Sequence, residues 1–180
     1  MNDTIDENAA LLEILKEAIS IEILGKEYYS VFIEHVSDKH AKAIFKGLLW
    51  DEDEHLEILK DEYKKLSGEP VDLEVLRAEN REKAKQMFPE SASLSITEIK
   101  DVLIKGIRTE ERSIGFYSLS AQKTGNKAVK DLLLRLVGLE DGHKGRLEGI
   151  LHYLEQEGSL YGYSSFYTRW ILSGLSSRPV

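Results

Sequence analysis

The chain has 180 residues, of which 42% are hydrophobic and 31% charged, and its formal net charge is −8. This size and composition predict one globular domain with a sizeable core, and the acidity argues against nucleic acid as a partner. The absence of cysteine excludes disulfides, thiolate metal sites, iron–sulfur clusters and thiol catalysis. No apolar run is long enough for a membrane span, and the acidic N-terminal stretch has no apolar signal segment. We therefore expect a cytoplasmic protein that binds no membrane.

The first third of the chain predicts a hairpin of two helices. Apolar residues recur at helical spacing over about residues 4–36, and Thr4 with Glu7 can form a capping box at the start. A short break at residues 37–38 precedes a second helix, which runs to about residue 66 and ends before a glycine and a proline. Such a short break makes the two helices antiparallel neighbours.

A long connection and a third helix follow. Residues 71–94 are charged and helix-prone in their first two thirds, and Phe88 and Pro89 close that stretch. A second capping box, Ser95 with Glu98, opens a helix that runs to about residue 123. The connection is long enough to travel back along the length of the bundle.

The last part of the chain predicts a fourth long helix and an aromatic tail. Asn126 follows a tight turn and can cap a helix that runs to about residue 156. The whole pattern predicts an all-α protein, an antiparallel four-helix bundle of two helical hairpins joined by a long crossover, over residues 1–157. The tail, residues 158–180, could add a short fifth helix.

One pattern of four residues occurs twice in the chain. In the first hairpin it consists of Glu22, Tyr29, Glu52 and His55. The same residue types return 88 positions later (110 − 22 = 88), as Glu110, Tyr117, Glu140 and His143. A repeat that preserves acids and histidines at fixed spacing predicts that the two hairpins share one chemical site.

The spacing places the repeated residues at one level of the bundle. Glu22 and Glu52 each lie fifteen residues from the first turn, or about 22 Å along a helix. Glu110 and Glu140 lie equally far from the second turn, and each histidine follows its glutamate by one helical turn on the same face. If the hairpins pack about a pseudo-twofold axis, four carboxylates and two imidazoles meet in the middle of the bundle.

A metal pair is the best explanation for such a cluster. Burying four carboxylates together without compensation would be prohibitive, whereas two divalent cations would balance their charge. Carboxylate and imidazole ligands suit iron or manganese, and the arrangement is that of di-iron carboxylate bundles.

Tyr29 and Tyr117 lie on the inward face, where each hydroxyl could hold a ligand carboxylate or the ring could simply pack in the core. Trp50 is expected to pack, and the nearby acids are expected to form a solvated face: Asp51, Asp53, Glu54 and Glu57.

These residues resemble the ferritin-like superfamily, and rubrerythrin-type domains most, over about residues 5–157. The resemblance implies a four-helix bundle, commonly a homodimer or larger homo-oligomer, that binds two iron ions, with manganese also possible. It implies that the glutamates of the two Glu-x-x-His motifs bridge the metals, that the other two glutamates are terminal ligands, and that each histidine binds one metal. The implied metal ligands are Glu22, Glu52, His55, Glu110, Glu140 and His143.

The chain departs from the rubrerythrin pattern in two ways. Rubrerythrins usually carry a further glutamate three residues after the third-helix ligand, where this chain has Ser113, so the site is closer to the six-ligand bacterioferritin pattern. Without cysteine the chain has no rubredoxin module, so an external electron donor such as a rubredoxin-like protein is implied. Met87 lies in the connection, and no haem is predicted.

The resemblance favours a non-haem di-iron oxidoreductase that reduces peroxide or dioxygen. The first alternative is a ferroxidase, or an iron-binding or storage protein of bacterioferritin-like type. The second is a structural bundle that binds no metal.

Overall fold

The structure, a computed structural model, describes residues 2–37, 39–90 and 93–158, with side chains from residue 8 onward except that of residue 40. The described part is all-α, as predicted, and contains no strand. Residue 38, the side chains of residues 4 and 7, and the tail at residues 159–180 lie outside it. The helix predicted to begin near Thr4 begins at Asn2. The helices are α1 (Asn2–His35), α2 (Lys39–Ser67), α3 (Glu74–Gln86), α4 (Ile96–Lys123) and α5 (Lys127–Glu157).

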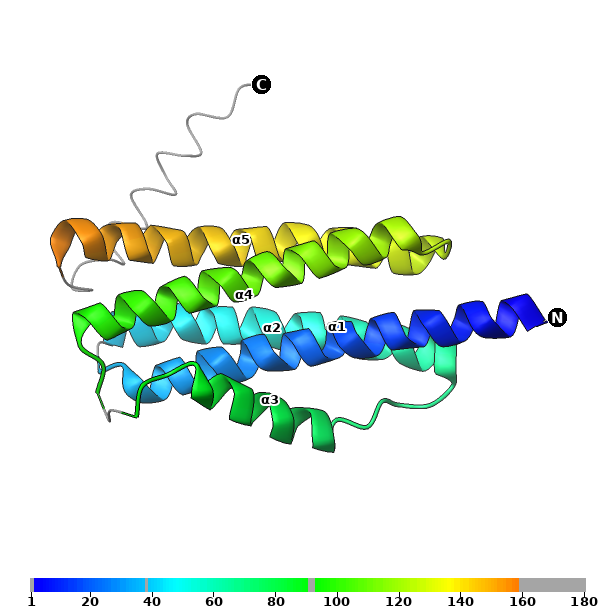
Figure 1. Ribbon diagram of the computed structural model, residues 1–180, viewed down its shortest axis with the longest axis horizontal. Coiled ribbons are helices and arrows are strands. Elements are labelled where there is room, and N and C mark those ends of the chain that lie inside the picture. The colour runs from blue at the N-terminus through cyan, green and yellow to red at the C-terminus, as the bar shows by residue number, and fades with distance from the viewer. Residues whose placement is uncertain (1, 38, 91–92, 159–180) are drawn as a thin grey trace, which may run out of the picture.

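Four of these helices form the predicted antiparallel bundle (Figure 1). The contacts between helices are densest within the pairs α1–α2 and α4–α5, which are the two hairpins. Their turns lie at opposite ends of the bundle, and the crossover carries α3 along the outside of α1. This arrangement puts the middle of all four long helices at one level.

Local capping fixes where the helices of the second hairpin begin and end. The Ser95 hydroxyl accepts a hydrogen bond from the Glu98 backbone N–H, and the Glu98 carboxylate accepts one from the Ser95 N–H at 2.7 Å. The Asn126 side chain accepts from the backbone N–H of Val129 at the start of α5. Gly158 ends α5 in the left-handed conformation, with φ of 65°, which glycine adopts without strain.

A buried polar layer divides the apolar core into two clusters. The first cluster lies toward the turn between α1 and α2, and includes Phe32, Phe45, Leu48, Leu103 and Leu154. The second lies toward the turn between α4 and α5, and includes Leu15, Ile19, Leu59, Leu133 and Leu136. Both clusters bury aliphatic and aromatic side chains almost completely. The hydrophobic effect therefore holds both ends of the bundle and leaves the middle for polar groups.

Polar contacts attach α3 to α1. The buried Asn80 amide donates hydrogen bonds to the Ser20 hydroxyl at 3.0 Å and to the Leu76 carbonyl at 2.9 Å. Arg81 forms ion pairs with two carboxylates of α1, Glu27 at 3.0 Å and Glu34 at 2.7 Å. The crossover is thus docked on the bundle.

The outer surface corrects one expectation. Trp50, expected to pack, is 71% exposed on α2. The position follows from helical geometry, because Trp50 lies two residues before the buried Glu52 and therefore points away from the bundle axis. No helix in the described ranges is both long and apolar enough to cross a membrane.

Candidate metal centre

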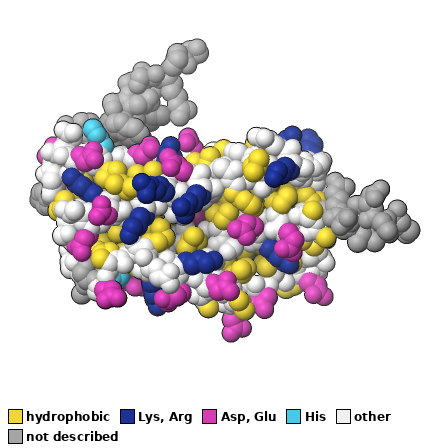
Figure 2. All heavy atoms as spheres, viewed as in Figure 1, with side chains coloured by type: hydrophobic (Ala, Val, Ile, Leu, Met, Phe, Trp, Pro, Cys, Tyr) yellow, Lys and Arg dark blue, Asp and Glu magenta, His cyan; other side chains and the backbone are white. Residues whose placement is uncertain are grey.

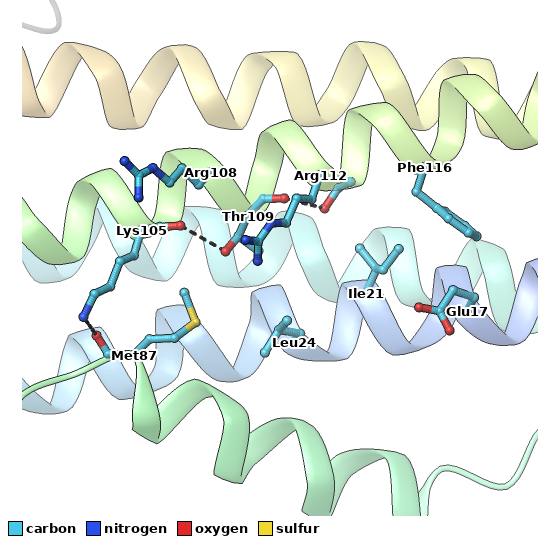
Figure 3. Close-up of a pocket in the computed structure, with 10 residues that line it drawn as sticks. Glu17, Ile21, Leu24, Met87, Lys105, Arg108, Thr109, Arg112 and Phe116 are labelled. Carbon is cyan, nitrogen blue, oxygen red and sulfur yellow. Dashed lines mark hydrogen bonds between the residues drawn. The ribbon is translucent and has the colours of Figure 1, made fainter.

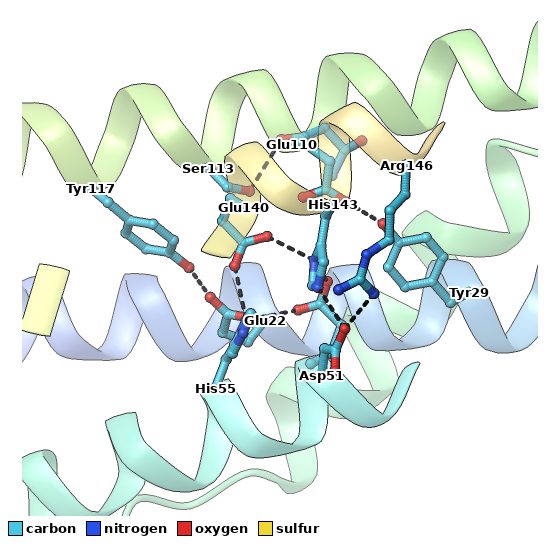
Figure 4. Close-up of polar contacts among 12 residues, drawn as sticks. Glu22, Tyr29, Asp51, His55, Glu110, Ser113, Tyr117, Glu140, His143 and Arg146 are labelled. Carbon is cyan, nitrogen blue, oxygen red and sulfur yellow. Dashed lines mark hydrogen bonds and ion pairs between the residues drawn. The ribbon is translucent and has the colours of Figure 1, made fainter. Parts of the chain in front are cut away.

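The structure brings all six predicted ligand residues together in the polar layer (Figure 4). α1 contributes Glu22 and α4 contributes Glu110, while the two Glu-x-x-His motifs lie on α2 and α5. None of the six residues is more than 3% exposed. Four carboxylates and two imidazoles are thus buried between two apolar clusters, where uncompensated charge would be costly.

The ligand atoms of the two Glu-x-x-His motifs converge. One ligand atom from each of Glu52, His55, Glu140 and His143 lies within 4.8 Å of the others. His55 Nδ1 is 2.9 Å from Glu140 Oε1 and 3.2 Å from Glu22 Oε2. His143 Nδ1 is 3.2 Å from an oxygen of Glu52 and from one of Glu140. Both imidazoles therefore face the carboxylates through the same ring nitrogen.

Three buried atoms in this cluster lack a hydrogen bond of good geometry. They are Glu52 Oε1, Glu140 Oε1 and His143 Nδ1. Leaving such atoms unsatisfied costs about 1–3 kcal/mol each, so native cores seldom contain several of them together. All three are good donors to a divalent cation, and the set of four carboxylates and two imidazoles balances the charge of two such cations. The residues present therefore fit a metal pair.

Burial and mutual repulsion disfavour ionisation of two of the carboxyls. The pKa of Glu52 is raised well above its ordinary value by burial first and then by the charges of Glu22 and Glu140. The pKa of Glu110 is likewise raised by burial and by the charge of Glu140. Without bound cations burial therefore favours the protonated form of both groups.

His55 and Glu140 form an ion pair instead. Burial lowers the pKa of His55, but the close contacts of its Nδ1 with the carboxylates of Glu140 and Glu22 outweigh burial and raise this pKa to about 10. Burial raises the pKa of Glu140, but its close contacts with the imidazoles of His143 and His55 outweigh that effect and lower this pKa to about 2. A metal that binds here must displace the protons on the histidine and on the protonated carboxyls.

The two predicted tyrosines contact the carboxylates in a crossed arrangement. Tyr29 of α1 donates its hydroxyl to Glu110 of α4, and Tyr117 of α4 donates to Glu22 of α1. Both rings are fully buried, and burial raises the pKa of both hydroxyls well above the ordinary value. Each hydroxyl therefore remains a donor at neutral pH and supports a glutamate of the other hairpin.

Asp51, expected on a solvated face, lies beside the cluster instead. Its carboxylate is 3.4 Å from His143 Nε2 and 2.6 Å from Arg146 Nη1 (Figure 4). The equivalent positions in the other half hold Leu139 and Ile58, which carry no charge. No signal in the sequence separates Asp51 from the neighbouring acids, because its role depends on how α2 packs against α5. The surroundings of the two histidines therefore differ.

Ser113 and Gly25 occupy equivalent positions of the repeat beside the cluster, and neither supplies a carboxylate. The buried Ser113 hydroxyl donates to the Thr109 backbone carbonyl at 3.1 Å, within its own helix. At Gly25 a Cβ atom would lie 2.9 Å from Glu52 Oε1. Glycine is thus required for α1 to pass this close to the carboxylate.

The chain was compared with protein-family models and with curated proteins. A family model described as Rubrerythrin matches residues 13–151. No curated protein matches the chain.

Three solved structures resemble the fold. One is a bacterioferritin-related protein from Bacteroides fragilis, described as a dodecameric thioferritin, with a TM-score of 0.61 and 17% identity over 96% of this chain and 98% of that one. The second, a hypothetical protein from Pyrococcus furiosus, gives 0.61 and 21% identity over 81% and 90%. The third, from Anabaena variabilis, joins a ferritin-like domain to a DJ-1/ThiJ/PfpI-like domain and gives 0.67 and 19% identity. The match covers 81% of this chain but only 40% of that two-domain protein.

Proposed function

Because the chain belongs to the rubrerythrin family, we propose that it is a di-iron oxidoreductase that reduces peroxide or dioxygen. The observation that carries the proposal is the buried cluster of converging glutamates and histidines, in which three buried polar atoms lack a hydrogen bond of good geometry. Iron is the metal proposed, and manganese accepts the same ligands.

The proposed ligand roles follow the positions of the side chains. Glu52 and Glu140, each 3.2 Å from His143 Nδ1, would hold both metals, which is the role that the family resemblance implies. Glu22 and Glu110 are terminal ligands, each held by a tyrosine hydroxyl. His55 and His143 each bind one metal through Nδ1.

The chain's own contribution is positioning, charge balance and exclusion of water. Bound as a ferrous pair, the metals would supply the two electrons that, with two protons, convert hydrogen peroxide into two molecules of water. The chain contains no cysteine, so the electrons that restore the ferrous pair come from an external donor, which we propose to be a rubredoxin-like protein.

Metal content and peroxide reactivity test this proposal. Anaerobic loading with ferrous iron should give two iron ions per chain by elemental analysis, and Glu52→Ala and His143→Ala should abolish this binding. Mixing the loaded protein with hydrogen peroxide in a stopped-flow spectrometer should oxidise the iron faster than free ferrous ion. An equal rate would rule out the peroxidase activity, and the absence of bound iron from the unmodified protein and from both variants would favour the metal-free structural bundle.

Iron oxidation for storage is the second candidate. Ser113 in place of the further glutamate supports it, and so does the likeness to a dodecameric thioferritin. Storage requires a closed shell, whereas peroxide reduction does not. Sedimentation of iron-loaded protein separates the two: a large assembly with a mineral core favours storage, and a small oligomer without one favours the oxidoreductase.

We also propose that the chain forms a homodimer or larger homo-oligomer. The exposed Trp50 supports this proposal, because an aromatic side chain of this size gains much from burial at an interface. Trp50→Glu should shift the oligomer toward monomer in sedimentation velocity, without loss of helical content.

A further inference from the structure

A groove runs between the two hairpins on the face shown in Figure 3. It lies between α1 and α4, which pack less closely than the helices within each hairpin, and it has a volume of about 480 Å³. This volume falls in the range of small-molecule pockets, about 300–1,000 Å³. Partly buried apolar side chains line much of it: Ile21, Leu24, Met87 and Phe116.

Basic side chains of α4 line the same groove. Lys105, Arg108 and Arg112 are exposed and lie at helical spacing along it. The Lys105 ammonium donates to the Met87 carbonyl at 2.7 Å, whereas neither arginine pairs with an acid in the described ranges. Figure 2 shows Lys and Arg side chains among hydrophobic ones on this face. On a chain with a net charge of −8, these three cations form a local site for an anion.

The repeat explains why the groove has two chemically different walls. Some residues of the two walls are equivalent at the offset of 88, but their chemistry differs, because Glu17 corresponds to Lys105 and Leu24 to Arg112. Outside the metal centre the two halves have thus diverged, one wall becoming apolar and the other basic. Such a surface suits a ligand that carries both an apolar part and a negative charge.

The ends of the groove also differ. Lys105 and Arg108 lie at the Met87 end, and Arg112 lies near the middle (Figure 3). Phe116 and Glu17 line the other end, where the Glu17 carboxylate would repel a second negative charge. The preferred ligand therefore has one charged end and one apolar end.

We propose that the groove binds a fatty carboxylate. Its carboxylate lies against Arg108 and Arg112, and its chain extends over Ile21 and Leu24 toward Phe116. Arginine suits this role because its planar guanidinium can hold both oxygens of a carboxylate. The ligand would lie along the turn of α4 that carries Thr109 and Ser113, next to Glu110. The inference does not depend on the metal or on the reaction proposed above.

Calorimetric titration of the full chain with decanoate, decanol and inorganic phosphate tests the proposal, with each ligand kept below its micellar concentration. Decanoate should bind with one molecule per chain, about five-fold or more tightly than decanol, because the carboxylate adds roughly one exposed ion pair. Arg112→Gln should weaken decanoate binding by about the same factor, and Leu24→Ser should weaken both decanoate and decanol. Lys100→Gln, on the same helix but outside the groove, is the matched control and should change nothing.

Three results would overturn the proposal. The first is decanoate binding that is absent, or that neither Arg112→Gln nor Leu24→Ser weakens. The second is phosphate binding as tight as decanoate binding, which would indicate a plain anion site. The third is a protein that does not bind decanoate and whose oligomer dissociates in the Arg112→Gln variant. That result would indicate that this face is a subunit interface. The Glu52→Ala variant, which is expected to lose metal, should still bind decanoate. Failure of the metal proposal can therefore be distinguished from failure of the groove proposal.

Discussion

A single methyl group at position 25 would meet a carboxylate of the candidate metal centre. The Cβ of Gly25→Ala would lie 2.9 Å from Glu52 Oε1, the flexible end of that side chain, so the carboxylate would move and the helix would remain. We expect a loss of about ten-fold or more in iron affinity, the size typical for a disturbed ligand. The free energy of unfolding of the metal-free protein should stay equal or rise by up to about 1 kcal/mol, because alanine favours helix.

Anaerobic iron titration and urea denaturation measure the two effects. Gly115→Ala on α4 is the matched control, because its Cβ would meet nothing within 4 Å. Equal iron affinity in both variants would show that Glu52 tolerates the added methyl group.

Asp51 offers a second test at the scale of one residue. Its carboxylate lies 3.4 Å from His143 Nε2, where it can orient the imidazole that faces the cluster through Nδ1. Asp51→Asn should therefore lower iron affinity about 10–100-fold, as is usual for the partner of a metal-binding histidine. Asp53→Asn, which removes an ion pair with Lys26 away from the cluster, should leave affinity unchanged and serves as the control. Comparable losses in both variants would indicate a general effect of surface charge.

At the scale of elements, α3 depends on one buried amide. Asn80→Ala removes hydrogen bonds to the Ser20 hydroxyl and the Leu76 carbonyl from a fully buried position. The expected loss in the free energy of unfolding is about 1–3 kcal/mol, measured by urea denaturation. Glu79→Ala, at the exposed neighbouring position, should change it by no more than about 0.5 kcal/mol. A smaller loss for Asn80→Ala would mean that the crossover is held mainly by the Arg81 ion pairs.

Helix positions were predictable because their signals are local. Ser95 with Glu98, Asn126 and Gly158 act on their own neighbours, and the structure places helix ends beside all of them. Convergence of the ligands was also predictable, because equal spacing about each turn fixes their level whatever the packing details.

Features that depend on how one helix faces another were not predictable. The crossed bonds of Tyr29 and Tyr117 depend on the rotation of each hairpin about its axis. The position of Asp51 beside His143 depends on the contact between α2 and α5, and its acidic neighbours conceal it. The groove beside Arg112 requires that two helices stay apart, which no spacing in the sequence encodes.

At the scale of the whole molecule, the protons of the centre link stability to pH. Without metal, Glu52 and Glu110 hold protons in the folded state that they lose near pH 4.5 when unfolded. His55 holds its proton up to about pH 10 when folded, against 6.5 when unfolded. The folded state therefore binds more protons than the unfolded state above about pH 5, and its stability falls as pH rises.

The melting temperature of chelator-treated protein should thus fall steadily between about pH 6 and pH 9. Each extra proton held by the folded state contributes about 1.4 kcal/mol per pH unit, and 1 kcal/mol corresponds to about 2–4 °C for a chain of this size. Metal-loaded protein should show a flatter dependence, because the cations replace these protons. Differential scanning calorimetry of both forms measures the slopes, and a metal-free melting temperature that rises with pH would contradict the proton assignments.

The crossed tyrosine contacts mean that one hairpin alone cannot form the complete centre. Each hairpin contains half of the proposed ligands. Its tyrosine hydroxyl donates a hydrogen bond to a glutamate of the other hairpin. Two copies of one hairpin, facing each other about a twofold axis, would contain every ligand and both hydroxyl contacts. One chain therefore contains both halves of a site that resembles a symmetric dimer. The crossover with α3 joins the two hairpins covalently, so they are always present in a one-to-one ratio.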